Sequence, residues 1–179
     1  ENEGLNNYSA VVKLTYKETE CIFMGDAEYE AEMDILESDA DVSADVIKIG
    51  HHGSYTATAM DFLKEVAPQY AIISVGEGNK YGHPHDATIS KLKGKCEIYR
   101  TDEIGTITLQ SDGEDIHIAY KESIYSKESD MLKSNNCNIK IAKSIQTTLK
   151  KCNRINDYTT IPNFFHIFNY RFYFFNNGR

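Results

Sequence analysis

The chain has 179 residues, of which 41% are hydrophobic and 26% are charged. This composition fits one domain with a modest core and excludes a large multidomain assembly. No apolar run approaches the roughly 18 residues that a transmembrane helix needs, and the first residues lack the pattern of a signal peptide, so we expect no membrane span in this chain.

Two segments of opposite charge make up the net charge of −8. Residues 1–120 hold 23 acidic and 9 basic side chains, whereas residues 121–179 hold 4 acidic and 10 basic ones. Ten of the eleven glycines lie in the first segment, and six of the eight phenylalanines lie in the second. We therefore predict a folded domain over 1–120 and a basic, Asn- and Phe-rich extension of doubtful fold over 121–179. Because the chain begins at Glu1 within a polar stretch, we interpret it as part of a longer protein.

The first half of the domain favours strands around one helix. Residues 11–16 and 21–24 are β-rich runs on either side of a polar turn, which predicts a hairpin. From Ala27 to about Glu37, acidic residues in the first turns and spaced apolar residues predict a helix. Asp45 to Ile49 is predicted to be a strand in which apolar and polar residues alternate.

The second half continues the alternation of helices and strands. Residues 59–66 have helical spacing, and residues 70–75 form a continuous apolar run, typical of a strand buried on both faces. Asp86 is a natural N-cap for a short helix that ends at Gly94. Further strands are predicted at Cys96–Arg100, Ile104–Leu109 and Asp115–Tyr120. This order predicts an α/β layered fold with a mixed sheet.

The extension gives weaker signals. Residues 131–151 are basic and are compatible with a helix, while residues 163–177 are rich in aromatic side chains without a clear period. We interpret 121–179 as a dispensable or aberrant extension, with a partner-binding tail as the alternative.

Three polar clusters lie in loops after predicted strands. They are Gly25-Asp26, Gly50-His51-His52-Gly53-Ser54 and Tyr81-Gly82-His83-Pro84-His85. In layered α/β proteins, sites gather beyond the strand ends, where loops bring polar side chains together on a rigid frame. Carboxylate and imidazole together suit a divalent metal such as zinc or manganese.

Each candidate also has a structural alternative that the sequence leaves open. Asp26 could cap the following helix. Ser54 is better explained as a helix cap than as a nucleophile, because no acid or base partner can be identified from the sequence. The four histidines could equally be solvated turn residues: His51, His52, His83 and His85.

The order of these clusters resembles the metallo-β-lactamase-fold hydrolases, and more narrowly the ComEC-type hydrolase domain of DNA-uptake competence proteins and its stand-alone relatives. The resemblance covers about Asn7 to Tyr120. The segments that carry it are Phe23–Glu28, Ala44–Ser54, Ala71–Gly76, Tyr81–His85 and Tyr99–Ile107.

The resemblance implies an αββα sandwich in which two divalent ions, zinc or manganese, bind at one sheet edge. Asp26 matches the family's metal-bridging aspartate. The last metal-ligand histidine falls on the His-His-Gly-Ser loop, where we favour His51 and keep His52 as nearly equal. His83 and His85 match a later loop that we place beside the substrate phosphate or the leaving group, as catalytic candidates.

The implied function is that of a metal-dependent phosphodiesterase or DNA nuclease linked to DNA uptake. Two metals would activate a water and hold a phosphoryl oxygen, which suits phosphodiester hydrolysis. The acidic domain argues against tight nonspecific DNA binding, so a DNA substrate rests on the resemblance alone. If the domain belongs to a competence channel, it would face the outside of the cell; a stand-alone relative would be secreted or cytoplasmic.

One motif of the family is missing from this sequence. The His-x-His-x-Asp-His motif, which supplies most of the metal ligands, occurs nowhere in residues 1–179. We therefore expect only the C-terminal half of the fold here, with the N-terminal half as its missing partner, and we expect this chain alone to be inactive. The alternatives are a binding module that kept the scaffold without chemistry, and a sister hydrolase acting on a small molecule or wall polymer.

Overall fold

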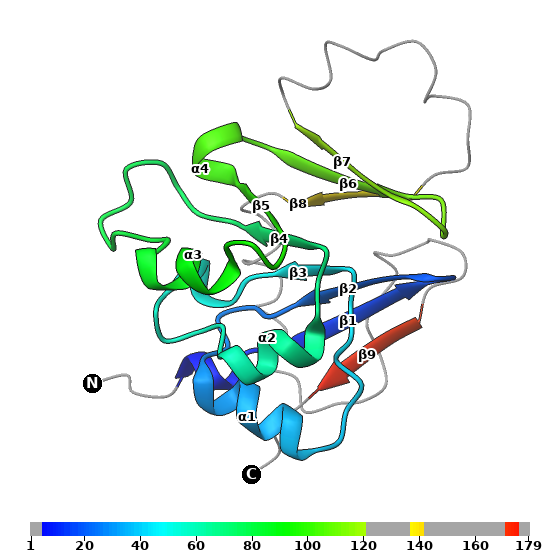
Figure 1. Cartoon of the computed structure of the whole chain (residues 1–179), viewed down its shortest axis with the longest axis horizontal. Helices are drawn as coiled ribbons and strands as arrows, with labels where there is room; N and C mark the ends of the chain where they lie inside the picture. The colour runs from blue at the N-terminus through cyan, green and yellow to red at the C-terminus, as the bar shows by residue number, and fades with distance from the viewer. Residues whose placement is uncertain (1–4, 121–136, 142–170, 176–179) are drawn as a thin grey trace.

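The computed structural model describes residues 5–120, 137–141 and 171–175. This part of the chain is mixed α/β, with one large and one small sheet (Figure 1). The large sheet has the order β5-β4-β3-β2-β1-β9, and its strands are β1 Val11–Tyr16, β2 Thr19–Phe23, β3 Val46–Lys48, β4 Tyr70–Ile73, β5 Glu97–Arg100 and β9 Arg171–Phe175. The small sheet has the order β7-β6-β8, and its strands are β6 Ile107–Ser111, β7 Ile116–Tyr120 and β8 Cys137–Ile141.

Parallel pairing in the centre of the large sheet decides where loops meet. β2, β3, β4 and β5 run parallel to one another, while β1 is antiparallel to both β2 and β9. The carboxyl ends of the parallel strands therefore lie at one edge of the sheet, and the loops that follow them are neighbours. This edge carries all three polar clusters of the sequence.

The strands are connected by short helices, which are η1 Leu5–Tyr8, α1 Tyr29–Glu37, η2 Gly50–Gly53, α2 Met60–Val66, α3 Asp86–Leu92 and α4 Thr101–Ile104. Helices α1, α2 and α3 cover one face of the large sheet (Figure 1). The small sheet packs on the opposite face, because Ile107 and Leu109 of β6 join Cys21, Val46 and Ile72 in one buried cluster.

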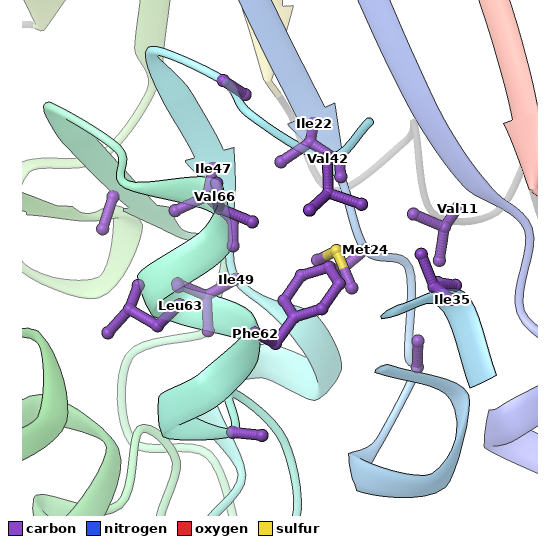
Figure 2. Packing of buried hydrophobic residues seen from close by; sticks show 14 of the residues in the cluster. Val11, Ile22, Met24, Ile35, Val42, Ile47, Ile49, Phe62, Leu63 and Val66 are labelled. Atoms are coloured by element: carbon purple, nitrogen blue, oxygen red, sulfur yellow. The ribbon is translucent and has the colours of Figure 1, made fainter. Parts of the chain in front are cut away.

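The main core lies between the large sheet and helices α1 and α2 (Figure 2). Phe62 of α2 is fully buried and packs in the same cluster as Ile22 and Ile47 of the sheet. Successive strand residues point to opposite faces, so Val46 and Ile47 serve different cores. Burying both faces of the central strands fixes their register and thereby the position of the loops that follow them.

The hairpin at residues 11–24 and the alternation of helices and strands are confirmed, with shifted ends. The first helix begins at Tyr29 rather than Ala27. Asp86 is the first residue of α3 rather than its N-cap, which is His85 and makes no side-chain capping bond. Ile104 ends α4 instead of beginning a strand. The strand predicted at 45–49 is confirmed as β3, and all of its residues are buried, including Lys48.

The extension contributes two strands to the described structure. Within the helix predicted at 131–151, residues Cys137–Ile141 instead form β8, which pairs antiparallel with β6. Within 163–177, residues Arg171–Phe175 form β9, which pairs antiparallel with β1. The other residues of both predicted elements lie outside the described part. The mixed α/β fold is confirmed, while the four-layer αββα sandwich stays a prediction.

A buried carboxylate ties α1 to the start of α2. Glu32 is 1% exposed, and its two oxygens accept hydrogen bonds from the backbone N–H groups of Thr58 at 2.7 Å and Ala59 at 2.6 Å. Burial raises the pKa of Glu32, and these two bonds offset part of that effect.

Replacing Glu32 by Ala should destabilise the fold by about 2–4 kcal/mol, because two buried N–H groups lose their acceptors. Chemical denaturation measures the change. Asp34→Ala, at an exposed position of the same helix, is the matched control and should change stability by less than about 0.5 kcal/mol. Equal effects of the two substitutions would contradict the assignment of Glu32 as a structural acceptor.

Candidate functional site

Three loops bring the predicted site residues together at the carboxyl edge of the large sheet. Asp26 follows β2, and His51 and His52 follow β3 within η2. His83 lies in the loop between β4 and α3, and its ring centroid is 5.4 Å from that of His51 and 6.3 Å from that of His52. Residues up to 57 positions apart in the chain thus share one site.

The two adjacent histidines have unusual backbone conformations. His51 has φ 42° and ψ 46°, and His52 has φ 55° and ψ 21°. Both values lie in the left-handed region, which costs a residue with a Cβ roughly 1–2 kcal/mol. Such strain persists only where the surroundings impose it, and it is concentrated at functional sites. Here it turns two successive imidazoles toward the same edge of the sheet.

Glycines on either side of the histidines allow neighbouring loops to approach closely. A Cβ at Gly50 would lie 2.6 Å from the carbonyl oxygen of Ala27. A Cβ at Gly53, where φ is +81°, would lie 2.6 Å from Cβ of Pro84. The backbone N–H of His85 also donates to the carbonyl of Gly53 at 2.9 Å. The η2 turn is therefore held between the Asp26 loop and the His83–His85 loop.

His52 directs one ring nitrogen at Asp26. Its Nδ1 lies 2.7 Å from the carbonyl oxygen of Ser74, which can only accept, so Nδ1 carries the proton. Nε2 then presents a lone pair, and it lies 3.7 Å from Oδ1 of Asp26. The Asp26 side chain is only 6% exposed. Burial lowers the pKa of His52 below its ordinary value, aided by the positive charge of Lys48.

Lys48 is a buried cation beside this pair. The residue is 6% exposed, and its Nζ donates to the carbonyl of Ile49 at 2.8 Å. Lys48 lies on the same face of β3 as Val46, and the small sheet covers that face, so the lysine is enclosed near the strand end.

His51 is held by a carboxylate. Its Nδ1 lies 2.8 Å from Oε1 of Glu28, and the same oxygen accepts from Thr56 Oγ1 at 2.7 Å and Asn6 Nδ2 at 3.4 Å. Burial acts to raise the pKa of Glu28, but these hydrogen bonds outweigh it and the net pKa is lowered. Glu28 is therefore ionised at neutral pH, and the proton of neutral His51 lies on Nδ1.

The third loop positions His83 and His85 differently. The backbone N–H of His83 donates to Oδ1 of Asn79 at 3.0 Å, and its carbonyl accepts from Nδ2 of Asn79 at 2.6 Å. Burial lowers the pKa of His83, and the neighbouring histidines add to the effect. Nδ1 of His85 accepts the backbone N–H of Tyr55 at 3.1 Å, which leaves Nε2 as the donor of neutral His85.

The structural alternatives raised from the sequence have mixed outcomes. Asp26 does not cap α1, because the N-cap position is Glu28, which makes no side-chain capping bond. Ser54 does not begin a helix either; its Oγ lies 2.8 Å from Oγ1 of Thr56 in the turn that follows η2. Sequence reasoning missed the contacts of Glu28, the Ser74 carbonyl and Asn79. Glu28 and Ser74 lie within segments that carry the family resemblance, but no signal in the sequence indicated which groups they contact.

The described residues contain no complete set of metal ligands. Over 5–120, 137–141 and 171–175, no group of three His, Cys, Asp or Glu side chains is arranged to hold a metal ion. Asp26 and His52 form a pair of donors with the carboxylate and imidazole chemistry that zinc and manganese accept. Further ligands would have to come from elsewhere.

The comparisons with known proteins point to bacterial competence. The chain is 38% identical over 103 residues to ComE operon protein 3 of Bacillus subtilis (strain 168) and 29% identical over 104 residues to competence protein ComA of Neisseria gonorrhoeae. It is 33% identical over 87 residues to recombination protein 2 of Haemophilus influenzae. These names support the relation to competence and DNA uptake that the sequence suggested. No family model matches the chain, and no solved structure matches it significantly.

The similarity covers a small part of each relative. The matched regions amount to 57%, 57% and 49% of this chain, but only 13%, 15% and 11% of the three relatives in the same order. Within the described part of the chain, no helix is long and apolar enough to cross a membrane.

Substituting Glu28 should release the His51 ring. In Glu28→Ala, Nδ1 of His51 loses its acceptor, so nitrogen NMR should show a mixture of tautomers in place of the Nδ1–H form. Glu28→Gln keeps an acceptor oxygen and should retain the Nδ1–H form. Glu37→Ala, at an exposed glutamate of the same helix, is the control. An unchanged His51 spectrum in Glu28→Ala would contradict this geometry.

Proposed function

We propose that this segment forms part of the active site of a metal-dependent phosphodiester hydrolase that acts on DNA during DNA uptake. In this proposal Asp26 and His52 are ligands of a divalent ion, and His83 and His85 lie beside the substrate. The observation that carries the proposal is the enclosed Asp26–His52 pair at the carboxyl edge of the sheet.

The separation of that pair fits two ligands of one ion. Oδ1 of Asp26 and Nε2 of His52 are 3.7 Å apart. Two ligands at metal distances of roughly 2.0–2.1 Å in a tetrahedral site lie about 3.3 Å from each other, so a small adjustment would allow both to bind. The Ser74 carbonyl fixes the His52 ring as outer contacts of metal-bound histidines do. These contacts favour His52 as the metal ligand, whereas the sequence analysis favoured His51.

The residues around the pair suit a charged phosphoryl group. A divalent ion would act as Lewis acid on a phosphoryl oxygen and lower the pKa of a bound water. The chain's own groups would orient the substrate: neutral His85 carries its proton on Nε2 and can donate a hydrogen bond to a phosphate oxygen. The lowered pKa of His83 keeps this ring neutral at pH 7, so it too could accept or donate a proton.

The competence names of the relatives support DNA as the substrate class. One of the three relatives is named a competence protein, another is named for the ComE operon, and the third is named for recombination. Residues 1–120 carry 23 acidic and 9 basic side chains, so binding would depend on the site itself rather than on a basic surface.

A second candidate function is a binding module without chemistry. The number of candidate metal ligands favours it. The described residues offer only the pair Asp26 and His52, whereas a catalytic zinc ion typically has three protein ligands. The two candidates differ in whether the complete protein, with its remaining segments, binds metal tightly and turns over a phosphodiester.

Manganese should bind weakly to this chain at the Asp26–His52 pair. Paramagnetic Mn²⁺ should selectively broaden the amide NMR signals near Asp26 and His52, and Asp26→Asn or His52→Gln should abolish the effect. His117→Gln, at an exposed histidine of β7, should leave the broadening unchanged. Broadening that survives both site substitutions, or that is centred elsewhere, would contradict the proposed pair.

In a protein that joins this chain to the N-terminal half expected from the resemblance, Asp26→Asn should lower phosphodiester hydrolysis by at least about 100-fold, because it removes a proposed metal ligand. The assay follows release of nitrophenol from bis(p-nitrophenyl) phosphate and cleavage of DNA with added Mn²⁺. Full activity of Asp26→Asn would rule out the enzyme proposal. No activity in the unsubstituted protein, at every divalent metal tested, would favour the binding module.

A further inference from the structure

A continuous strip of aromatic rings leads away from the candidate site. We define this aromatic strip by Tyr81, His83, His85 and Tyr55. The ring centroids are 5.8 Å apart from Tyr81 to His83, 4.7 Å from His83 to His85 and 5.1 Å from His85 to Tyr55. Tyr81 and His83 are stacked with their planes 26° apart, while the other two contacts are edge-to-face.

The two tyrosines at the ends of the strip are open to solvent. Tyr55 is 63% exposed and Tyr81 is 66% exposed, so neither contributes to the core. Exposed aromatic rings that gather in one place, as these two do with His83 and His85, are a feature of recognition surfaces. Their order is imposed by the fold, since the backbone N–H of Tyr55 donates to His85 and the Asn79 side chain fixes the backbone around Tyr81 and His83.

The strip begins at the candidate site itself. His83 is the ring that faces the η2 histidines, at 5.4 Å from His51 and 6.3 Å from His52. A ligand held at the Asp26–His52 pair by a phosphate would therefore have its adjoining groups close to His83 and the exposed tyrosines. Nζ of Lys80 lies 5.0 Å from the centroid of Tyr81 and places a positive charge at the outer end of the strip.

The chemistry of the strip fits a planar, unpaired ring attached to a phosphate. Aromatic side chains stack on nucleobases without regard to sequence, because every base has a π-face. In a duplex those faces are occupied by neighbouring bases, so only single-stranded segments offer them. Residues 1–120 carry 23 acidic and 9 basic side chains, so attraction of the phosphate backbone is weak and stacking must supply much of the affinity.

We propose that the aromatic strip is a stacking platform for unpaired nucleobases next to the scissile phosphodiester. The platform makes single-stranded nucleic acid the ligand class of the site. This inference deepens the proposed function and rests on it for the position of the phosphate. Binding of bases to the strip requires no metal, and this separates its test from the tests of hydrolysis.

The experiment is an NMR titration of the 179-residue chain, in EDTA, with a single-stranded oligodeoxyadenylate of about eight nucleotides. The ring protons of Tyr55 and Tyr81 should move upfield, as stacking under a base requires. An abasic strand with the same number of phosphates, and a duplex of the same length, should give smaller shifts and weaker binding.

Ring-deleting and ring-retaining variants separate stacking from other contacts. Tyr81→Ala and Tyr55→Ala should each raise Kd by about 5- to 100-fold, whereas Tyr81→Phe and Tyr55→Phe should stay within about threefold of the unsubstituted chain. Lys80→Ala should weaken binding. Lys17→Ala, which removes the similar lysine near Tyr16 at the far end of the β1–β2 hairpin, should not. Both tyrosines are exposed, so thermal melting should show that these variants fold normally.

Four outcomes would overturn the platform. They are the absence of tyrosine shifts with the single strand, equal binding of the abasic strand, equal binding of the duplex, and unchanged affinity in both alanine variants. Shifts with a chitin oligosaccharide but not with the single strand would assign the strip to a glycan instead. Because none of these measurements uses metal or turnover, the platform can fail while the hydrolase proposal stands, and the reverse also holds.

Discussion

The close approach of three loops around the η2 turn is the constraint on which the site depends. A Cβ at Gly50 would clash with the carbonyl oxygen of Ala27, and a Cβ at Gly53 would clash with Pro84. Both ends of the turn are packed against neighbouring loops, and this packing holds His51 and His52 in left-handed conformations. Without such support, the two residues would relax to ordinary backbone angles. The parallel strands β2, β3 and β4 provide the frame, because they deliver the three loops to the same edge.

The two adjacent histidines are held by different contacts and point toward different residues. The Ser74 carbonyl orients His52 toward the buried Asp26, while the Glu28 carboxylate fixes His51 near His83. This difference is set by partners that are distant in sequence, so two neighbouring residues of one type have different orientations and contacts. Around Asp26 and Lys48 the site is polar and buried, whereas Tyr55 and Tyr81 near His83 and His85 are exposed to solvent.

The sequence predicted the frame well, because strand and helix periods are local properties. The hairpin at β1 and β2, the buried run at β4 and the loops after the strands all follow from patterns within a few residues. The burial of Lys48 had no local signal, because the sheet that covers it, residues 107–111 and their neighbours, is formed by a later part of the chain. The strands β8 and β9 were missed for a similar reason, since their pairing with β6 and β1 is long-range.

The candidate site was predictable in composition but not in geometry. Asp26 and the histidines stood out because polar residues followed apolar strands. Which histidine faces Asp26 depends on left-handed backbone angles and on the Ser74 carbonyl, neither of which has a local signal. Glu28 was noted as a residue of the helix start, whereas the fold uses it to hold His51, Thr56 and Asn6 together.

The central claim is that Asp26 and His52 share one divalent ion. Crystals of the chain grown with zinc and measured at the zinc absorption edge test it most directly. The account predicts an anomalous peak within about 2.0–2.2 Å of both Oδ1 of Asp26 and Nε2 of His52. A peak bound to His51 without Asp26, or bound only at surface histidines such as His117, would contradict it.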